Sequence, residues 1–253
     1  MSVVEFGGSG PGILLLHGLM SRASTWWTVA QWLKPHGRVV GLDARGHGRN
    51  PRRGPFRTED FVADAASAIE RLDLGPAVVV GHSMGGLHAW ALAALRPDLV
   101  RGVVAEDVVP DNRGRSVDEW RWYFEAWPAP FRSLAHVRTV VDVPRVEELF
   151  EERADGWHLI AELDDLYEIA AEWGERSYWD FVDAIRCPLL VVEAGRGALP
   201  AGQMAEVVRR CAARGLTAHH VVVPESGHVV HDEAPEVYRG AVEAFLSGSI
   251  PPV

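Results

Sequence analysis

The chain has 253 residues, 47% hydrophobic and 24% charged, which is enough for one substantial globular domain or for a domain with a large insertion. Its formal net charge of −10 argues against a nucleic-acid partner, because such partners bind clustered basic surfaces. With two cysteines, no signal-peptide pattern and no apolar run near the roughly 20 residues of a membrane span, we expect a cytoplasmic protein with no membrane partner.

Short aliphatic runs alternate with helical patterns along most of the chain. The runs occupy residues 13–16, 38–42, 77–80, 100–105, 188–192 and 219–223. Strands buried on both faces have such continuous runs, and their alternation with helices is typical of βαβ units. The sequence therefore predicts an α/β fold with a mostly parallel, doubly wound sheet.

Residues 111–185 interrupt this alternation. The segment holds six of the ten tryptophans, shows helical spacing, and has no β-like run except a short one near Val140. We expect a helical cap or lid here, inserted into a core made of residues 1–110 and 186–253. Its aromatic residues either pack the insertion onto the core or line an apolar pocket. As pocket-lining residues we expect Trp27, Trp122, Trp127 and Val229.

The sequence Gly-His-Ser-Met-Gly-Gly at 81–86 directly follows the run at 77–80 and precedes a helical pattern. A G-x-S-x-G motif between a strand and a helix predicts a strained turn that exposes the serine hydroxyl. This context makes Ser83 the candidate nucleophile. The motif at 17–19, His-Gly-Leu, closes an earlier strand, and its loop can direct a backbone N–H at a substrate carbonyl. We expect an oxyanion hole made by the N–H groups of Leu19 and Met84.

Four motifs together carry a family resemblance: HGL at 17–19, DARGHG at 43–48, GHSMGG at 81–86 and ESGH at 225–228. Their order and spacing resemble the α/β-hydrolase superfamily over essentially the whole chain, with residues 111–185 where that family carries its cap. The resemblance implies that His228 is the general base for Ser83. It implies no cofactor. We expect no metal, because the adjacent His219 and His220 would point to opposite faces of a strand and no Cys or acidic residue has ligand spacing to them.

The acidic partner of His228 is open between three residues. The family most often places this acid in the loop after the strand at 189–192, but Gly197 stands there. Some relatives take the acid from the end of the strand after the nucleophile helix, where this chain has Glu106 and Asp107. Adjacent strand residues point to opposite faces, so only one of the two can serve. We favour Asp107 over Glu106 and Glu193.

A serine nucleophile suits acyl transfer, and the leading expectation is hydrolysis of a carboxylic ester of a small or apolar molecule through an acyl-enzyme. The alternatives are C–C bond hydrolysis, lactone or thioester hydrolysis, a lyase reaction on the same triad, or a small-molecule receptor with little turnover. The charged turn at 43–47 and His82 are expected to be structural. Nothing in the sequence predicts an oligomeric state.

Overall fold

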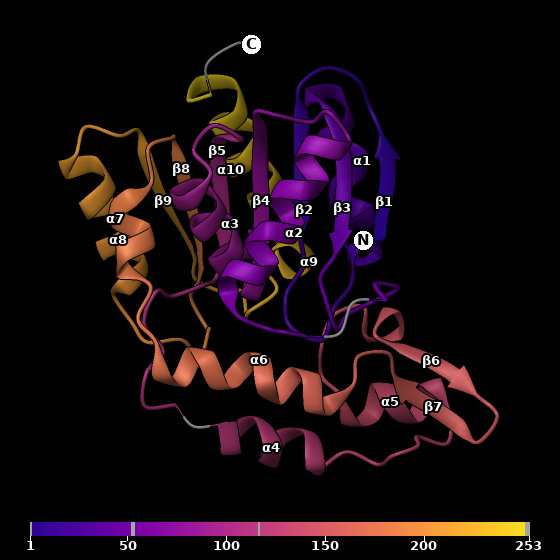
Figure 1. Ribbon diagram of the computed structural model, residues 1–253. Coiled ribbons are helices and arrows are strands. Elements are labelled where there is room, and N and C mark those ends of the chain that lie inside the picture. The colour runs from indigo at the N-terminus through magenta and orange to yellow at the C-terminus, as the bar shows by residue number, and fades with distance from the viewer. Residues whose placement is uncertain (1, 52–53, 116, 251–253) are drawn as a thin grey trace.

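The computed structural model describes residues 2–51, 54–115 and 117–250, and its centre is a seven-stranded sheet (Figure 1). The strand order is β1-β3-β2-β4-β5-β8-β9, with β1 antiparallel to β3 and the other neighbours parallel. The strands are β1 Ser2–Gly7, β2 Gly12–Leu16, β3 Arg38–Asp43, β4 Ala77–His82, β5 Val100–Glu106, β8 Leu189–Ala194 and β9 Ala218–Val223. The predicted parallel α/β sheet is confirmed.

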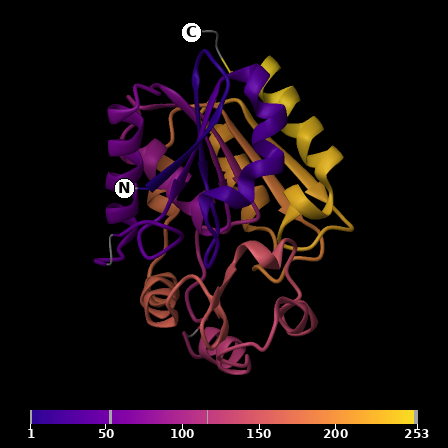
Figure 2. The ribbon, with the colours of Figure 1, turned by 90° about the vertical axis from the view of Figure 1, so that its right-hand side faces the viewer.

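Helices cover both faces of this sheet, as continuously buried strands require. Figure 2 shows α1 and α10 on one face and α2 and α3 on the other. Helices α7 and α8 pack on the same face as α3. The bounds are α1 Trp27–Leu33, α2 Thr58–Arg71, α3 Met84–Leu95, α7 Trp179–Ala184, α8 Gln203–Ala213, α9 Val230–Glu233 and α10 Pro235–Gly248.

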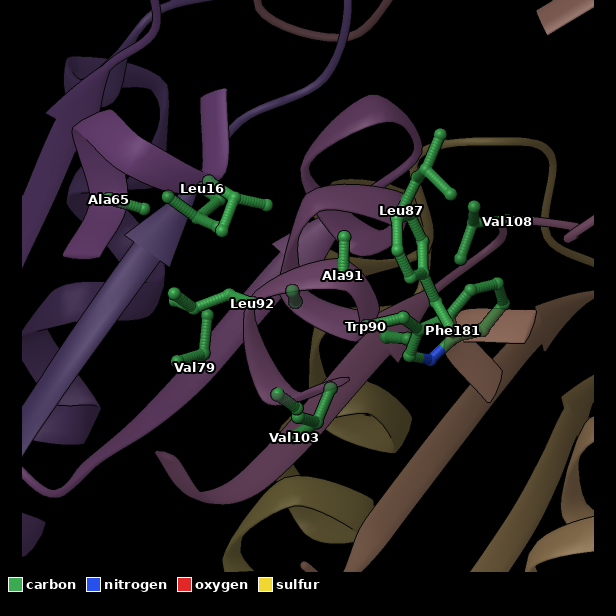
Figure 3. Packing of buried hydrophobic residues seen from close by; sticks show 14 of the residues in the cluster. Leu16, Ala65, Val79, Leu87, Trp90, Ala91, Leu92, Val103, Val108 and Phe181 are labelled. Carbon is green, nitrogen blue, oxygen red and sulfur yellow. The ribbon is translucent and has the colours of Figure 1, made fainter. Parts of the chain in front are cut away.

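Helix α3, which follows the serine motif, is the most deeply buried helix of the core. Its residues from Met84 to Ala93 are all buried, in keeping with a helix that is apolar on every side. Trp90 and Leu92 pack against strand residues including Val79 and Val103 (Figure 3). This packing fixes the first turn of α3 relative to the ends of β4 and β5.

Most of the segment between β5 and β8, from α4 to α6, forms a separate layer across the carboxyl-terminal edge of the sheet, whereas α7 packs on the core beside α3 (Figure 1). This layer contains α4 Val117–Glu125, α5 Leu134–Val140, β6 Phe150–Arg153, β7 Gly156–Leu159 and α6 Leu163–Glu175.

Two features of this layer differ from the sequence-based expectation. The aliphatic run near Val140 ends helix α5 and is not a strand. In addition, β6 and β7 form a small antiparallel sheet that the sequence analysis did not anticipate. Half of their eight residues are polar and all but Phe150 are exposed or half-buried, so they lack the aliphatic signal of the core strands. None of the described helices is long and apolar enough to cross a membrane.

Candidate active site

Ser83 occupies the sharp turn between β4 and α3. Its backbone has φ 52° and ψ −119°, a conformation that costs about 1–3 kcal/mol for a residue with a side chain. The turn is held by the Ser83 N–H, which donates to the Glu106 carbonyl at 2.8 Å. It also needs close backbone packing: a Cβ on Gly85 would lie 2.2 Å from the Leu16 carbonyl oxygen. The serine motif therefore forms the strained turn that its glycines predict.

The end of β5 lies beside this turn and carries Asp107. The register pairs His82 with Glu106, so the residue after each strand lies at the same edge of the sheet. Asp107 is fully buried and accepts a hydrogen bond at 2.6 Å from Nδ1 of His228. Its other carboxylate oxygen accepts the Ala194 N–H at 3.0 Å. With Nδ1 occupied as a donor, His228 presents Nε2 as its free ring nitrogen, as a general base requires.

The other two candidate acids bind other histidines. Glu106 is also fully buried, but it points to the opposite face and accepts hydrogen bonds from His231. Glu193 accepts a hydrogen bond from His220 at 2.6 Å. A Cβ added to Gly197 would lie 3.1 Å from the Asp107 carboxylate, so position 197 and Asp107 adjoin the same space. The acidic side chain from the end of β5 thus occupies the space that an acidic side chain from the loop after β8 would otherwise occupy.

The loop after β2 is fixed by two buried neutral histidines. Nε2 of His17 accepts the Ala44 N–H at 3.0 Å, and Nε2 of His47 accepts the Met20 N–H at 3.1 Å. Burial is the main cause that lowers the pKa of both rings, in His47 to about 3. Leu19 lies between these anchored positions and lines the same cavity as Ser83.

Two cavities of very different size meet at Ser83 and His228. The larger has a volume of about 990 Å³ and the smaller about 70 Å³. The small cavity is largely apolar and includes Met84, Leu87, Val108, Val109, Trp173, Tyr178 and Leu199. The large cavity carries many charges: Arg115, Glu119, Asp142, Arg145, Arg196, Asp232 and Glu233.

Of the four expected pocket residues, Val229 alone lines either of these cavities. Trp122 is 77% exposed on α4, and Trp27 is 56% exposed with its edge against Phe6. Trp127 packs among Phe124, Phe131 and other rings inside the layer that runs from α4 to α6. The expectation was wrong for these three tryptophans, because a tryptophan's position in sequence does not say which side of a helix faces the cavity.

Several cavity residues were overlooked in the sequence. Trp173 follows Leu166, Ile169 and Ala170 on the buried face of α6, and this spacing could have identified it as the tryptophan nearest the core. Arg115 and Arg196 come from loops far apart in sequence, and no sequence pattern links them. Among the described residues, no group of three or more His, Cys, Asp or Glu side chains could hold a metal ion.

Comparison with known proteins agrees with this architecture. A family model for the alpha/beta hydrolase fold matches residues 11–142. An esterase of Mycobacterium tuberculosis is 29% identical, over 96% of this chain and 86% of its own. The 2-(acetamidomethylene)succinate hydrolase of Mesorhizobium japonicum is 28% identical over 94% of this chain and 89% of its own. The crystal structure of E-2-(acetamidomethylene)succinate hydrolase superposes with a TM-score of 0.85 at 26% identity, covering 97% of this chain and 94% of that one. The chain is therefore a hydrolase and belongs to the α/β-hydrolase fold family.

Proposed function

We propose that the protein hydrolyses a carboxylic ester through an acyl-enzyme on Ser83. The observation that carries this proposal is the strained Ser83 turn beside a histidine whose Nδ1 is held by a buried carboxylate. Ser83 Oγ would attack the ester carbonyl and transfer its proton to Nε2 of His228. His228 would then protonate the departing alcohol. Water, deprotonated by the same nitrogen, would release the acid and regenerate Ser83.

Negative charge on the carbonyl oxygen would be stabilised by the N–H groups of Leu19 and Met84. Met84 is the first residue of α3, where an N–H has no partner within the helix. The N–H groups of Met20 and Ser21 are already bonded, to His47 and to Gly18, whereas no described backbone group accepts from Leu19. One removed donor of this kind typically costs about 10²–10³ in kcat.

The two cavities support a substrate with a short acyl group and a larger polar remainder. The apolar 70 Å³ cavity suits a short acyl chain, and the charged 990 Å³ cavity suits the rest of the molecule. In this proposal the segment 111–185 acts as the cap over the catalytic centre, since it contributes Arg115 and Tyr123 to the large cavity and Trp173 to the small one.

The test is a series of p-nitrophenyl esters from acetate to decanoate, combined with a fluorophosphonate probe. We expect turnover that is fastest for short chains and is abolished by one covalent adduct on Ser83, located by mass spectrometry. Ser83→Ala should remain unlabelled, whereas Ser21→Ala, which removes another serine lining the large cavity, should still be labelled. Absence of ester turnover, or an adduct on another residue, would contradict the proposal.

A second candidate is hydrolysis of an acidic substrate, as the names of the succinate hydrolase relatives suggest. The observation that favours it is a pair of arginines, Arg115 and Arg196, in the large cavity. Arg115 donates to the Ala198 carbonyl, beside Arg196, and neither arginine forms an ion pair with a described residue. Glu119 and Asp142 also line this cavity, so its charge is mixed.

For this candidate, the matched substrates are p-nitrophenyl hemisuccinate and p-nitrophenyl butyrate, which have four-carbon acyl groups with and without a carboxylate. Arg196→Gln is expected to lower kcat/KM for the hemisuccinate by about 10-fold relative to the butyrate, the effect of one charged hydrogen bond. Arg209→Gln on the exposed side of α8 serves as the control and should leave the ratio unchanged. An unchanged ratio in Arg196→Gln would rule this arginine out as a carboxylate site.

A further inference from the structure

A second carboxylate–histidine pair lies directly beside the first. Glu106 precedes Asp107 and points to the other face of the sheet, where it is fully buried. It accepts hydrogen bonds from the His231 N–H at 2.9 Å and from Nδ1–H of the same residue at 2.8 Å. Removing one partner of a buried ion pair typically costs several kcal/mol, so this pair is a strong structural constraint.

This pair is connected to both residues that carry the proposed chemistry. The Glu106 carbonyl accepts the Ser83 N–H. The Glu106 carboxylate accepts the N–H of His231, which lies in α9, three residues after His228. His82, the neighbour of Ser83, donates its Nε2–H to the His228 carbonyl at 2.9 Å. The backbone at His228 and just after it is thus tied to the ends of β4 and β5.

We propose that Glu106, His231 and His82 form a positioning network that fixes the backbone of His228 relative to Ser83. The inference rests on the proposed function, because it concerns the reach of His228 Nε2 to the Ser83 hydroxyl. The Asp107 carboxylate holds the imidazole at Nδ1, but the His228 side chain is 43% exposed and lies in a loop, so its backbone also has to be held in place. A misplacement of about 1 Å can cost about 10² in rate.

The network acts by position, because its charges cancel locally. Burial disfavours the imidazolium of His231, but the adjacent Glu106 carboxylate outweighs burial and raises the pKa. Burial likewise opposes ionisation of Glu106, and His231 outweighs it and lowers the pKa. The rings packed around His231 are those of Trp26, His82 on β4 and Tyr238 on α10. The charged groups that act on it are Glu106 on β5, the adjacent Asp232, and Arg145.

The test compares two substitutions of His231. Asn can offer an amide N–H close to the place of the histidine Nδ1–H, whereas Leu offers none. We expect His231→Leu to lower kcat for p-nitrophenyl acetate, and the second-order rate of fluorophosphonate labelling of Ser83, by about 10- to 100-fold with KM nearly unchanged. His231→Asn should be at least about fivefold faster than His231→Leu in both assays. If the role of His231 were purely structural, the substitutions would lower the melting temperature, but the hydrolysis rate divided by the concentration of Ser83 that can be labelled would stay unchanged.

A second pair of variants covers the case in which His231→Leu does not fold. In His82→Gln the side-chain amide can still donate to the His228 carbonyl, and in His82→Met it cannot, so Gln should be several-fold faster than Met. Equal rates within both pairs, or a wild-type rate per labelled site in the Leu and Met variants, would overturn the inference.

The labelling rate also separates this inference from the proposed function. If wild-type protein labels at Ser83 but hydrolyses no ester, the function fails while the variant ratios still test the network. If Ser83 does not label, the far-downfield NMR resonance of the His228 Nδ1 proton tests the network instead. It should be present in the wild type and in His231→Asn, and lost or shifted in the Leu and Met variants; an unchanged resonance would overturn the network.

Discussion

Asp107→Asn is expected to lower kcat for p-nitrophenyl acetate by about 10⁴-fold while the protein stays folded. The reason lies in the two hydrogen bonds of this carboxylate. One oxygen accepts the Ala194 N–H and the other accepts Nδ1–H of His228. An asparagine would keep its oxygen on the Ala194 N–H, so its amide group would face His228. That arrangement favours the tautomer with the proton on Nε2, which cannot accept the proton of Ser83.

Steady-state kinetics and thermal unfolding of the same preparation check this prediction. Glu193→Gln is the matched control: it changes another acid at the same edge of the sheet, one that binds His220, and should keep kcat within about twofold of the wild type. If Asp107→Asn retained more than a tenth of the wild-type rate, Asp107 would not be the acid that orients His228.

The positions of the buried strands along the chain and the position of the serine turn were predictable because they depend on local pattern. The run at 77–80 is entirely apolar, as a strand buried on both faces has to be. Gly85 has no side chain, so the turn at Ser83 can pack closely against the backbone of β2. The choice of Asp107 over Glu106 was open for a physical reason. Adjacent strand residues are equivalent in pattern, and only the partner histidines, His228 and His231, distinguish them.

The substrate cavity was much less predictable than the catalytic residues. Trp122 and Trp173 both lie on helices of the inserted segment, yet one is almost fully exposed and the other lines the small cavity. Their environments depend on how α4 and α6 pack over the sheet edge, and packing between layers leaves little periodic signal. Likewise, the strand β1 at the sheet edge has a half-buried pattern that is not distinctive in sequence.

Acidification to pH 5 is expected to remove much of the free energy of unfolding. Burial, the largest cause in each case, lowers the pKa of His17, His47, His82 and His88, in the last three to about 3. In the unfolded chain these rings titrate near 6.5. Between these values the unfolded state binds more protons than the folded state, so stability falls as pH falls below about 6.5.

In two of these rings the hydrogen bonds add to the effect of burial. Nε2 of His17 and Nε2 of His47 each accept a backbone N–H, so an added proton would place two donors against each other. Each ring that stays unprotonated costs about 1.4 kcal/mol per pH unit below 6.5, which makes about 6 kcal/mol at pH 5 for the three rings with a pKa of about 3. The lowered pKa of His17 adds to this loss. Folded domains have about 5–15 kcal/mol in total.

His231 has the opposite dependence and offsets part of this loss, whereas the contribution of its partner Glu106 changes little between pH 7.5 and pH 5. The raised pKa of His231 adds stability that is fully present below about 6.5 and disappears as pH rises through the folded value. The lowered pKa of Glu106 adds stability that is present above about 4.5 and disappears as pH falls through the folded value. Both contributions are therefore in place at pH 5, and the net loss should be less than the four neutral histidines alone would give.

Urea unfolding at pH 7.5, 6 and 5 measures this balance. His88 stacks on Phe61 with ring centroids 4.2 Å apart, so His88→Phe replaces a ring that titrates by one that does not and keeps an aromatic ring at this position. The variant should lose about 2 kcal/mol less than the wild type between pH 7.5 and pH 5, the share of a single histidine. If His88→Phe lost as much stability as the wild type between pH 7.5 and pH 5, and the wild type lost none, these rings would accept protons in the folded state. The loop carrying Leu19 would then not be held by neutral imidazoles.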